Sequence, residues 1–267
     1  MTGEGKFFET LGDGISTKIP GGLVSDGIIK TTDPDKTRKY MRLDFDSHPI
    51  FMTNNGDFAA PTGANGDENI MMFPEGTLEY HVIGTNTILG PTFGTLGLEA
   101  ILDAADDEGM ETCGGILASN KLIFTVGTDA AFFVKMKFNI ATVAGTDYCV
   151  LGFRKMEAYQ AAVDDYDEMA ALNVNAGNIL YQNILNGGAT VVTDTTDNWA
   201  DAATHELEVR ISAAGVASYR IDGLPPTVAA AAFTFDDGEV VTPFFYCLNN
   251  STTTATLTMI EFECGLQ

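Results

Sequence analysis

A run of acidic residues, DDYDE, is the densest group of potentially reactive side chains in the sequence, and it spans Asp164, Asp165, Tyr166, Asp167 and Glu168. On a strand, Asp165 and Asp167 would point to the same side, because side chains alternate between the two faces. Cleavage of a glycosidic bond needs two carboxyl groups that face each other across a cleft. The run lacks the Glu-x-Asp-x-x-Glu spacing that such chemistry uses on β-sandwiches. We therefore interpret it as a solvated acidic loop.

The same acidic run, or other oxygen-rich loops, could coordinate a cation. They include Asp103, Asp106 and Asp107, and two Asn-Gly-Asp segments at 54–57 and 65–68. Ca²⁺ accepts carboxylate and carbonyl oxygens from flexible loops. None of these loops has the spacing of a known calcium loop, and a chain with 37 acidic residues produces such clusters by chance. The sequence therefore nominates no metal ligand.

The histidines carry no recognisable catalytic motif. His48, His81 and His205 are remote from one another and from any Ser or Cys in a hydrolase pattern. The glycine pairs at 114–115 and 187–188 are typical of turns or bulges, because no phosphate-binding loop follows a strand. We predict no catalytic and no cofactor-binding residue, and hence no enzyme.

Aromatic residues next to acids are the candidates for contact with a sugar. The only tryptophan, Trp199, either packs the edge of the fold or stacks on a saccharide with help from Asp197 and Asp201. Tyr159 and Tyr166, which also have acidic neighbours, form the second candidate pair.

The cysteines lie far apart in the chain, at Cys113, Cys149, Cys247 and Cys264. No two of them have the close spacing of a zinc knuckle or a redox motif. We predict buried free thiols that act as small apolar side chains, with a disulfide or a ligand role as the alternatives.

A hairpin is the clearest structural element around these residues. In HELEVRISAAGVASYRIDG, Leu207, Val209 and Ile211 alternate with charged residues, which predicts a half-buried strand. Small residues around Gly215 allow the chain to reverse, and a second alternating segment ends at an Asp-Gly turn at 222–223.

Similar patterns predict further strands between turn signals, and helical periodicity is scarce. The one helix candidate, Lys155 to Ala162, is either a turn or two of helix or an irregular loop. The fold class is therefore all-β, a two-sheet antiparallel jelly-roll sandwich. The strands that we expect are 69–73, 78–83, 132–140, 148–153, 169–174, 179–185, 239–248 and 255–262.

Charge excludes one class of partner. The net charge of -23 makes unassisted binding to nucleic acid implausible, since phosphate contacts need a basic patch. The longest apolar run, Val228 to Phe233, is too short to cross a membrane. The first residues also lack a basic start and a hydrophobic stretch of signal-peptide length, so we expect synthesis in a cytoplasm.

Basic residues gather at the beginning of the chain. Seven of the 14 fall within residues 1–42, and none falls within 43–119. We predict an extended N-terminal arm over 1–42 that lies against another protein, with an ordinary first domain of average charge as the alternative. A loop-rich connector with short strands over 43–90 and a β-sandwich domain over 91–267 follow it.

Two segments carry a resemblance to known families. The pattern from Trp199 to Gly223 resembles the late hairpin of concanavalin A-like sandwiches of the laminin-G sort. The stretch from FTVGTDAAFF to ALNV, followed by ILNGGATVVTDTTDNWAD, resembles structural proteins of marine tailed bacteriophages, and this similarity covers about Gly97 to Cys264.

That resemblance implies a non-enzymatic virion structural protein that decorates or cements the exterior of a phage capsid. The implied partners are the major capsid protein or neighbouring virion subunits, with homo-oligomers, as trimers, around local symmetry points. The implied location is the capsid surface after synthesis in the host cytoplasm. The alternative is a glycan- or receptor-binding module of a phage fibre or head, with a host glycan as ligand.

Overall fold

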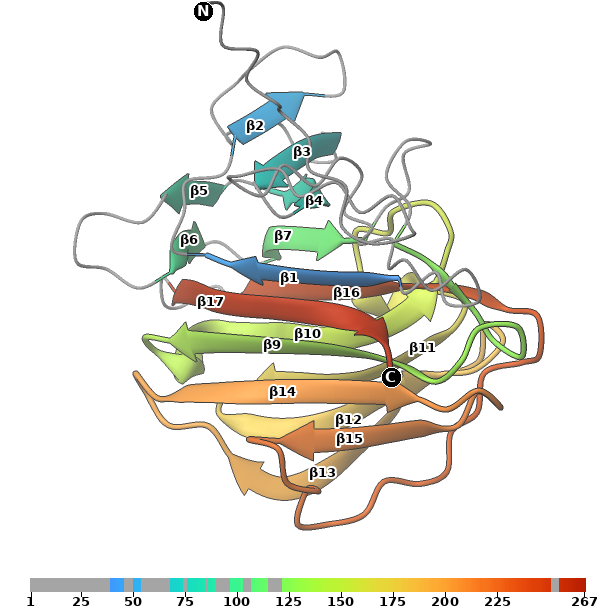
Figure 1. The fold of residues 1–267 in the computed structure, drawn as a ribbon. Coiled ribbons are helices and arrows are strands. Elements are labelled where there is room, and N and C mark those ends of the chain that lie inside the picture. Colours follow the sequence, from blue (N-terminus) through green and yellow to red (C-terminus); the bar gives the residue numbers. More distant parts are fainter. Residues whose placement is uncertain are drawn as a thin grey trace, which may run out of the picture.

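The chain forms a β-sandwich of two antiparallel sheets, and in Figure 1 the sheet with β17, β9 and β14 lies in front of the sheet with β10, β11 and β12. The computed structural model describes residues 39–45, 50–53, 68–73, 76–84, 86–89, 97–102, 107–114, 122–250 and 255–267. No helix within these ranges is long and apolar enough to cross a membrane. The jelly-roll class predicted from the sequence is confirmed.

The first sheet has seven strands. Its order is β15 (Ala217–Ile221), β14 (Thr204–Ile211), β9 (Phe132–Ile140), β17 (Ala255–Leu266), β6 (Leu98–Leu102) and β5 (Asn86–Leu89), and β1 (Tyr40–Asp44) pairs with β17 beside β6.

The second sheet has ten strands. Its order is β13 (Val191–Asn198), β12 (Asn178–Ile184), β11 (Met169–Asn175), β10 (Thr146–Lys155), β16 (Val240–Asn249), β7 (Glu108–Cys113), β4 (Gly76–Ile83), β3 (Glu68–Phe73) and β2 (Ile50–Thr53), and β8 (Phe124–Thr125) pairs with the start of β16. Two short 3₁₀ turns, η2 (Val143–Gly145) and η3 (Val163–Asp165), lie in its connections.

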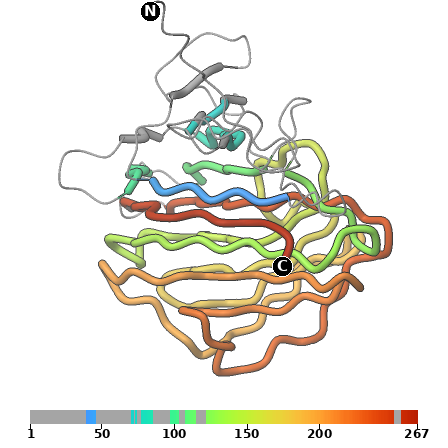
Figure 2. The backbone as a smooth tube through the Cα atoms, in the orientation of Figure 1, coloured from blue at the N-terminus to red at the C-terminus, as the bar shows by residue number. Residues whose placement is uncertain are grey.

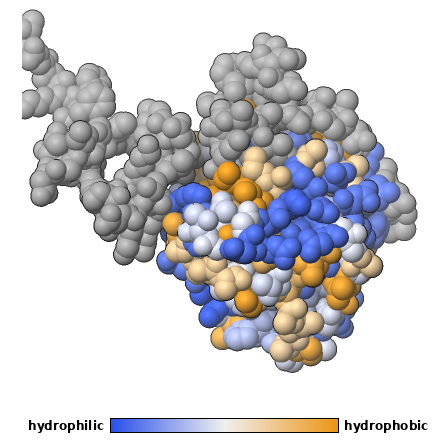
Figure 3. All heavy atoms as spheres, turned by 90° about the vertical axis from the view of Figure 1, so that its right-hand side faces the viewer, coloured by the Kyte–Doolittle hydropathy of each residue, from blue (hydrophilic) through white to orange (hydrophobic). Residues whose placement is uncertain are grey.

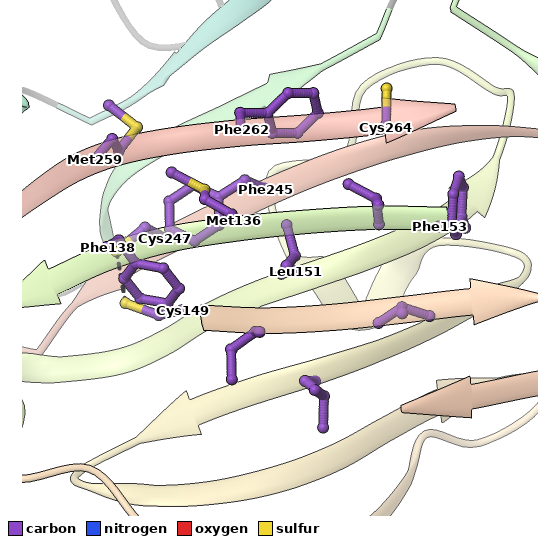
Figure 4. Close-up of a cluster of buried hydrophobic side chains, with 14 of the residues drawn as sticks. Met136, Phe138, Cys149, Leu151, Phe153, Phe245, Cys247, Met259, Phe262 and Cys264 are labelled. Atoms are coloured by element: carbon purple, nitrogen blue, oxygen red, sulfur yellow. Dashed lines mark hydrogen bonds between the residues drawn. The ribbon is translucent and has the colours of Figure 1, made fainter. Parts of the chain in front are cut away.

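Alternation along the strands builds the core between the sheets. Phe138 of β9 faces Phe245 of β16, with ring centroids 5.3 Å apart, and Phe153 of β10 contacts Phe132 at 5.0 Å. Figure 4 shows Phe138, Phe153 and Phe245 among the side chains between the layers. Burial of this apolar area supplies most of the driving force for folding.

The predicted hairpin is present as β14 and β15. Leu207, Val209 and Ile211 are fully buried, and Gly215 takes the positive φ of +81° that the reversal requires. The turn at Asp222-Gly223 has both residues at positive φ, as in a type I′ turn.

The other predicted strands also form. Their counterparts are β3, β4, β9, β10, β11, β12, β16 and β17. The helix candidate is not a helix: Lys155 ends β10, and 156–162 is irregular chain. This segment belongs instead to the connection between β10 and β11, two adjacent strands of the same sheet, and Val163 and Tyr166 of that connection are buried.

The predicted arm and connector contribute strands to both sheets. Tyr40, Met41 and Arg42, which we placed in the arm, lie in β1, and β1 runs along β17 so that the first and last described strands are neighbours (Figure 2). Strands β2, β3 and β4 of the predicted connector extend the ten-stranded sheet. Residues 1–38 and the predicted boundary at 90–91 lie outside the described residues.

All four cysteines are buried thiols that form no disulfide, as predicted. Cys149 and Cys247 are opposite each other on β10 and β16, with their sulfur atoms 3.0 Å apart in the core (Figure 4). Burial and the neighbouring thiol raise the pKa of Cys149 well above its usual value, so this thiol is unreactive at neutral pH.

The surface is mixed in polarity. On the face shown in Figure 3, hydrophilic groups form a continuous patch and hydrophobic groups are separate. The large hydrophobic residues exposed in the described part of the chain are Leu185, Val191, Val192, Val216, Leu224 and Val228.

Candidate functional site

One face of the ten-stranded sheet points away from the core and is covered by the loop 156–168, which joins β10 to β11. We call this face the outer face. Val163 and Tyr166 of the loop are buried against it, within a second hydrophobic cluster that includes Val150, Phe244 and Tyr246. The loop therefore belongs to the packed structure, and the side chains beneath it are removed from water.

A charged pair lies under this loop. Arg154 of β10 reaches Glu111 of β7 through Nη2 at 2.6 Å and Nε at 3.0 Å, and both side chains have no exposed surface. The guanidinium lies over the ring of Tyr166, 4.4 Å from its centroid, and the Tyr166 hydroxyl donates a hydrogen bond to the second Glu111 oxygen. Three groups from separate elements thus neutralise and satisfy one another.

Burial and the neighbouring charges shift the pKa values of Arg154 and Tyr166. Desolvation alone would lower the pKa of Arg154, but the Glu111 carboxylate more than offsets it and keeps the guanidinium charged. Burial and the same carboxylate raise the pKa of the Tyr166 hydroxyl well above its usual value. Tyr166 therefore stays a hydrogen-bond donor at all pH values of interest.

A pocket of about 330 Å³ opens beside this cluster. Ile83 and Leu248 contribute apolar lining, and the loop supplies residues 161–164. Asp107, Tyr148 and Asp164 bring the polar groups, and both aspartates are exposed. Burial first, and then the charges of Asp164, Asp147 and Asp107, raise the pKa of Tyr148.

A chain of amide groups fixes Asp164 in the pocket wall. The backbone N–H of Cys149 donates to Asn173 Oδ1 at 3.1 Å, and Asn173 Nδ2 donates to Gln182 Oε1 at 2.7 Å. Gln182 Nε2 then donates to Asp164 Oδ1 at 2.8 Å, and Thr190 adds a second hydrogen bond at 3.1 Å. Because each member is anchored on a strand or its loop, the carboxylate is held in one orientation.

A second group of polar side chains on the outer face could hold a metal ion. Glu79 and His81 lie on β4, Cys113 lies on β7, and one donor atom from each falls within 4.8 Å of the others. Sequence spacing gave no sign of this group because its members come from strands that pair across the sheet. The available signal was the alternation Glu-x-His and Glu-x-Cys, which puts the pairs 79, 81 and 111, 113 on common faces.

Several sequence candidates are placed differently from our hypotheses. Trp199 is 2% exposed and stacks on Phe138 at 4.5 Å, with its Nε1 donating to the Ala203 carbonyl, so it packs the sandwich and cannot stack on a sugar. Asp197 accepts hydrogen bonds from Thr227, and Asp201 accepts one from the Val143 backbone. These acids stabilise loops.

The tyrosine pair is also structural. Tyr166 is buried on Glu111, and Tyr159 stacks on His81 with ring centroids 4.7 Å apart. Of the other histidines, His205 pairs with Asp222 at 2.7 Å, and His48 lies outside the described residues.

The acidic run lies in a loop, as predicted, but its side chains differ in burial and in their partners. Asp165 and Asp167 do not share a strand face, because the chain turns through η3 before β11 begins. Asp167 pairs with Lys155 at 2.6 Å. Glu168 is fully buried, and burial together with the charges of Glu239 and Asp236 raises its pKa to about 7.

Only some of the candidate calcium ligands lie within the described residues. Asp107 joins Asp164 at the pocket, so two acidic groups far apart in sequence meet there. Asp103, Asp106 and residues 54–57 lie outside the described residues, as do 65–67.

A second pocket, of about 260 Å³, lies at the other end of the sandwich. Its lining is mostly alanine and proline from 225–232. Its two tyrosines are already engaged, Tyr181 with the Val228 carbonyl and Tyr219 with Asn183. Unlike the first pocket, it is lined by no charged side chain.

Comparisons with known proteins give no family. No family model and no curated protein sequence matches the chain. Among solved structures, a protein of unknown function from Shewanella oneidensis MR-1 is similar at TM-score 0.49 and 15% identity, over 85% of this chain and 86% of that one.

Two further structures illustrate the range of similar folds. The carbohydrate recognition domain of Emp46p, in its potassium-bound form, is similar at TM-score 0.49 and 4% identity, over 69% of this chain and 87% of that one. An alginate lyase from Pseudomonas aeruginosa is similar at TM-score 0.44 and 13% identity, over 64% of this chain and 83% of that one. At these values the comparisons transfer neither a ligand nor a reaction, and the sequence resemblance to phage proteins stays a prediction.

The buried ion pair generates a prediction about stability. Arg154→Met leaves the Glu111 carboxylate buried without its cation, so the free energy of unfolding should fall by about 3–5 kcal/mol. In the double variant Arg154→Met/Glu111→Gln, the free energy of unfolding should fall much less, because no uncompensated charge remains buried. Urea denaturation measures both. Arg42→Met removes an exposed pair with Glu261 and should cost less than about 1 kcal/mol; equal losses in the single and double variants would contradict the assignment.

Glu168 generates a prediction about pH. Its pKa is raised from 4.5 to about 7, so the folded state holds a proton that the unfolded state releases. The stabilisation is complete below pH 4.5 and is lost as the pH rises through about 7. Glu168→Gln should therefore stabilise the protein relative to wild type at pH 8 and change it little at pH 4.5.

The measurement is the urea midpoint of both proteins across this range. The difference between them isolates Glu168 from other titrating groups, His81 among them. A difference that does not change with pH would show that Glu168 does not titrate in this window.

Proposed function

We propose that this chain is a non-catalytic binding module that holds a saccharide in the pocket between the outer face and the loop 156–168. The observation that carries the proposal is the composition of that pocket: two carboxylates, of which Asp164 is held by hydrogen bonds, together with a tyrosine and apolar side chains. Sugars present the same combination, with hydroxyl donors at the edges of a ring whose C–H groups are apolar.

The polar groups suit recognition of hydroxyl groups. Asp164 and Asp107 accept hydrogen bonds, and a carboxylate acceptor gives a stronger bond than a neutral one. Tyr148 offers a ring face and a hydroxyl. The apolar side chains of Ile83 and Leu248 suit the C–H groups of a pyranose.

Preorganisation favours binding over catalysis at this site. Asp164 Oδ1 already accepts hydrogen bonds from Gln182 and Thr190, and an oxygen engaged in this way is suited to remain an acceptor. A carboxyl group that acts as a general acid must instead give up a proton to the leaving group.

The binding proposal is tested on a glycan array, with and without Ca²⁺, followed by calorimetry on the saccharides retained. Asp164→Asn keeps Oδ1 for Gln182 and Thr190 but removes the charge, so affinity should fall about tenfold or more. Tyr148→Ala should also weaken binding. Asp165→Asn, in the same 3₁₀ turn but outside the pocket lining, is the matched control and should bind as wild type.

Two results would count against this proposal. Retention of no saccharide, or retention that all three variants share, would remove the pocket as a glycan site. Release of shortened chains from a retained polysaccharide would show that the module is catalytic.

We also propose, from the sequence resemblance and the charge distribution, that the module is carried on a tailed-phage capsid by its N-terminal residues. What supports attachment at this end is the anchoring of the first described residues. Lys39 pairs with Asp129 at 2.9 Å, and Tyr40 donates to Glu263 at 2.7 Å. The residues that precede Lys39 are therefore joined to a strand, β1, that is anchored in the sheet.

Deletion of residues 1–38 tests this location, because it spares β1 and its pairing with β17. The truncated protein should lose co-sedimentation with capsids that lack this protein, while keeping its circular dichroism spectrum. Light scattering of both forms would report whether trimers form. Undiminished co-sedimentation of the truncated protein would contradict the proposal.

A further inference from the structure

Three side chains with metal-binding donors meet on the outer face, beneath Tyr159 of the loop 156–168. Glu79 and His81 are two apart on β4, so they point to the same side of the sheet. Cys113 is the direct partner of Glu79 on β7. Cys113 Sγ lies 3.9 Å from Glu79 Oε2, and His81 Nε2 lies 4.0 Å from the same oxygen.

His81 is the observation that points to a ligand. Its side chain has no exposed surface, and neither ring nitrogen has a hydrogen-bond partner. A buried polar group in this state costs about 1–3 kcal/mol, and such groups are rare in folded proteins. Stacking on Tyr159 holds the ring in place without satisfying either nitrogen.

Imidazole is the commonest metal ligand among protein side chains. Neutral imidazole has the lone pair that a metal ion needs.

The local charge also matches a divalent cation. Arg154 is committed to Glu111 by two hydrogen bonds, so this pair contributes no net charge. A carboxylate from Glu79 and a thiolate from Cys113 would balance a 2+ ion, with the imidazole as neutral third donor. Binding would release the Cys113 thiol proton to solvent.

The donor set selects the kind of metal. Ca²⁺ and Mg²⁺ take oxygen ligands, whereas thiolate and imidazole favour Zn²⁺. Zinc bonds of about 2.0–2.3 Å put two ligand atoms of a tetrahedral ion roughly 3.3–3.8 Å apart. The donor atoms here, within 4.8 Å of one another, need to close by less than about 1.5 Å to reach that spacing.

We propose that Glu79, His81 and Cys113 bind a zinc ion that links β4 to β7 under Tyr159. Three protein donors leave one position of a tetrahedral ion for a small ligand such as water. The site is separate from the saccharide pocket, although Ile83, two residues beyond His81 on the same strand face, lines that pocket. The inference does not depend on the proposed function.

The experiment uses the full chain, stripped with a chelator and titrated with Zn²⁺ and with Co²⁺ as a spectroscopic probe. We expect about one equivalent of either metal, a thiolate-to-Co²⁺ charge-transfer band, and a higher melting temperature with Zn²⁺. Cys113→Ser should abolish the band. Loss of an outer-shell residue weakens metal binding 10–100-fold, so loss of this direct ligand should weaken Zn²⁺ binding by about 100-fold or more.

Cys264→Ser, another buried thiol, and His205→Gln are the controls, and both should bind zinc as wild type does. If Cys113→Ser does not fold, the wild-type Co²⁺ spectrum together with His81→Gln decides the question. The proposal is overturned if the wild type shows no charge-transfer band, if the band survives Cys113→Ser, or if zinc affinity is unchanged in His81→Gln.

Discussion

The ion pair of Arg154 with Glu111 sets the main constraint on this structure. Both charges lie on the face of the ten-stranded sheet that points away from the sandwich core, yet neither has exposed surface. Such a pair is tolerated only when its remaining hydrogen-bonding capacity is satisfied. Tyr166 meets this requirement by donating to the carboxylate and lying over the guanidinium, and it thereby fixes the loop 156–168 on the sheet.

The loop 156–168 borders both candidate sites on the outer face. Its residues 161–164 form one wall of the pocket, while its Tyr159 covers His81. A flat sheet face cannot enclose a small ligand, because enclosure needs concave walls. The pocket with Asp107 and Asp164 and the cluster with Glu79 and Cys113 thus both depend on where one loop is held.

Much of the sandwich could be predicted from local patterns. Alternation in Leu207, Val209 and Ile211, with the Asp-Gly turn after them, corresponds directly to β14 and β15. Such patterns are local because the face to which a side chain points depends only on whether its position in the strand is odd or even. Strands such as β7 and β13 were missed: β7 is buried almost throughout, and β13 is mostly exposed, so neither shows the alternation of a half-buried strand.

By itself, the sequence determined the all-β class, the main strands and their inward faces, the burial of the cysteines and the acidic surface, because each follows from residue type and short-range spacing. Only the tertiary structure decided that Trp199 is core, that Asp107 meets Asp164, and that His81 lies beside Cys113. These contacts depend on which strands become neighbours and in which register. Partner choice between distant segments is settled by packing of the whole sheet, and no local spacing encodes it.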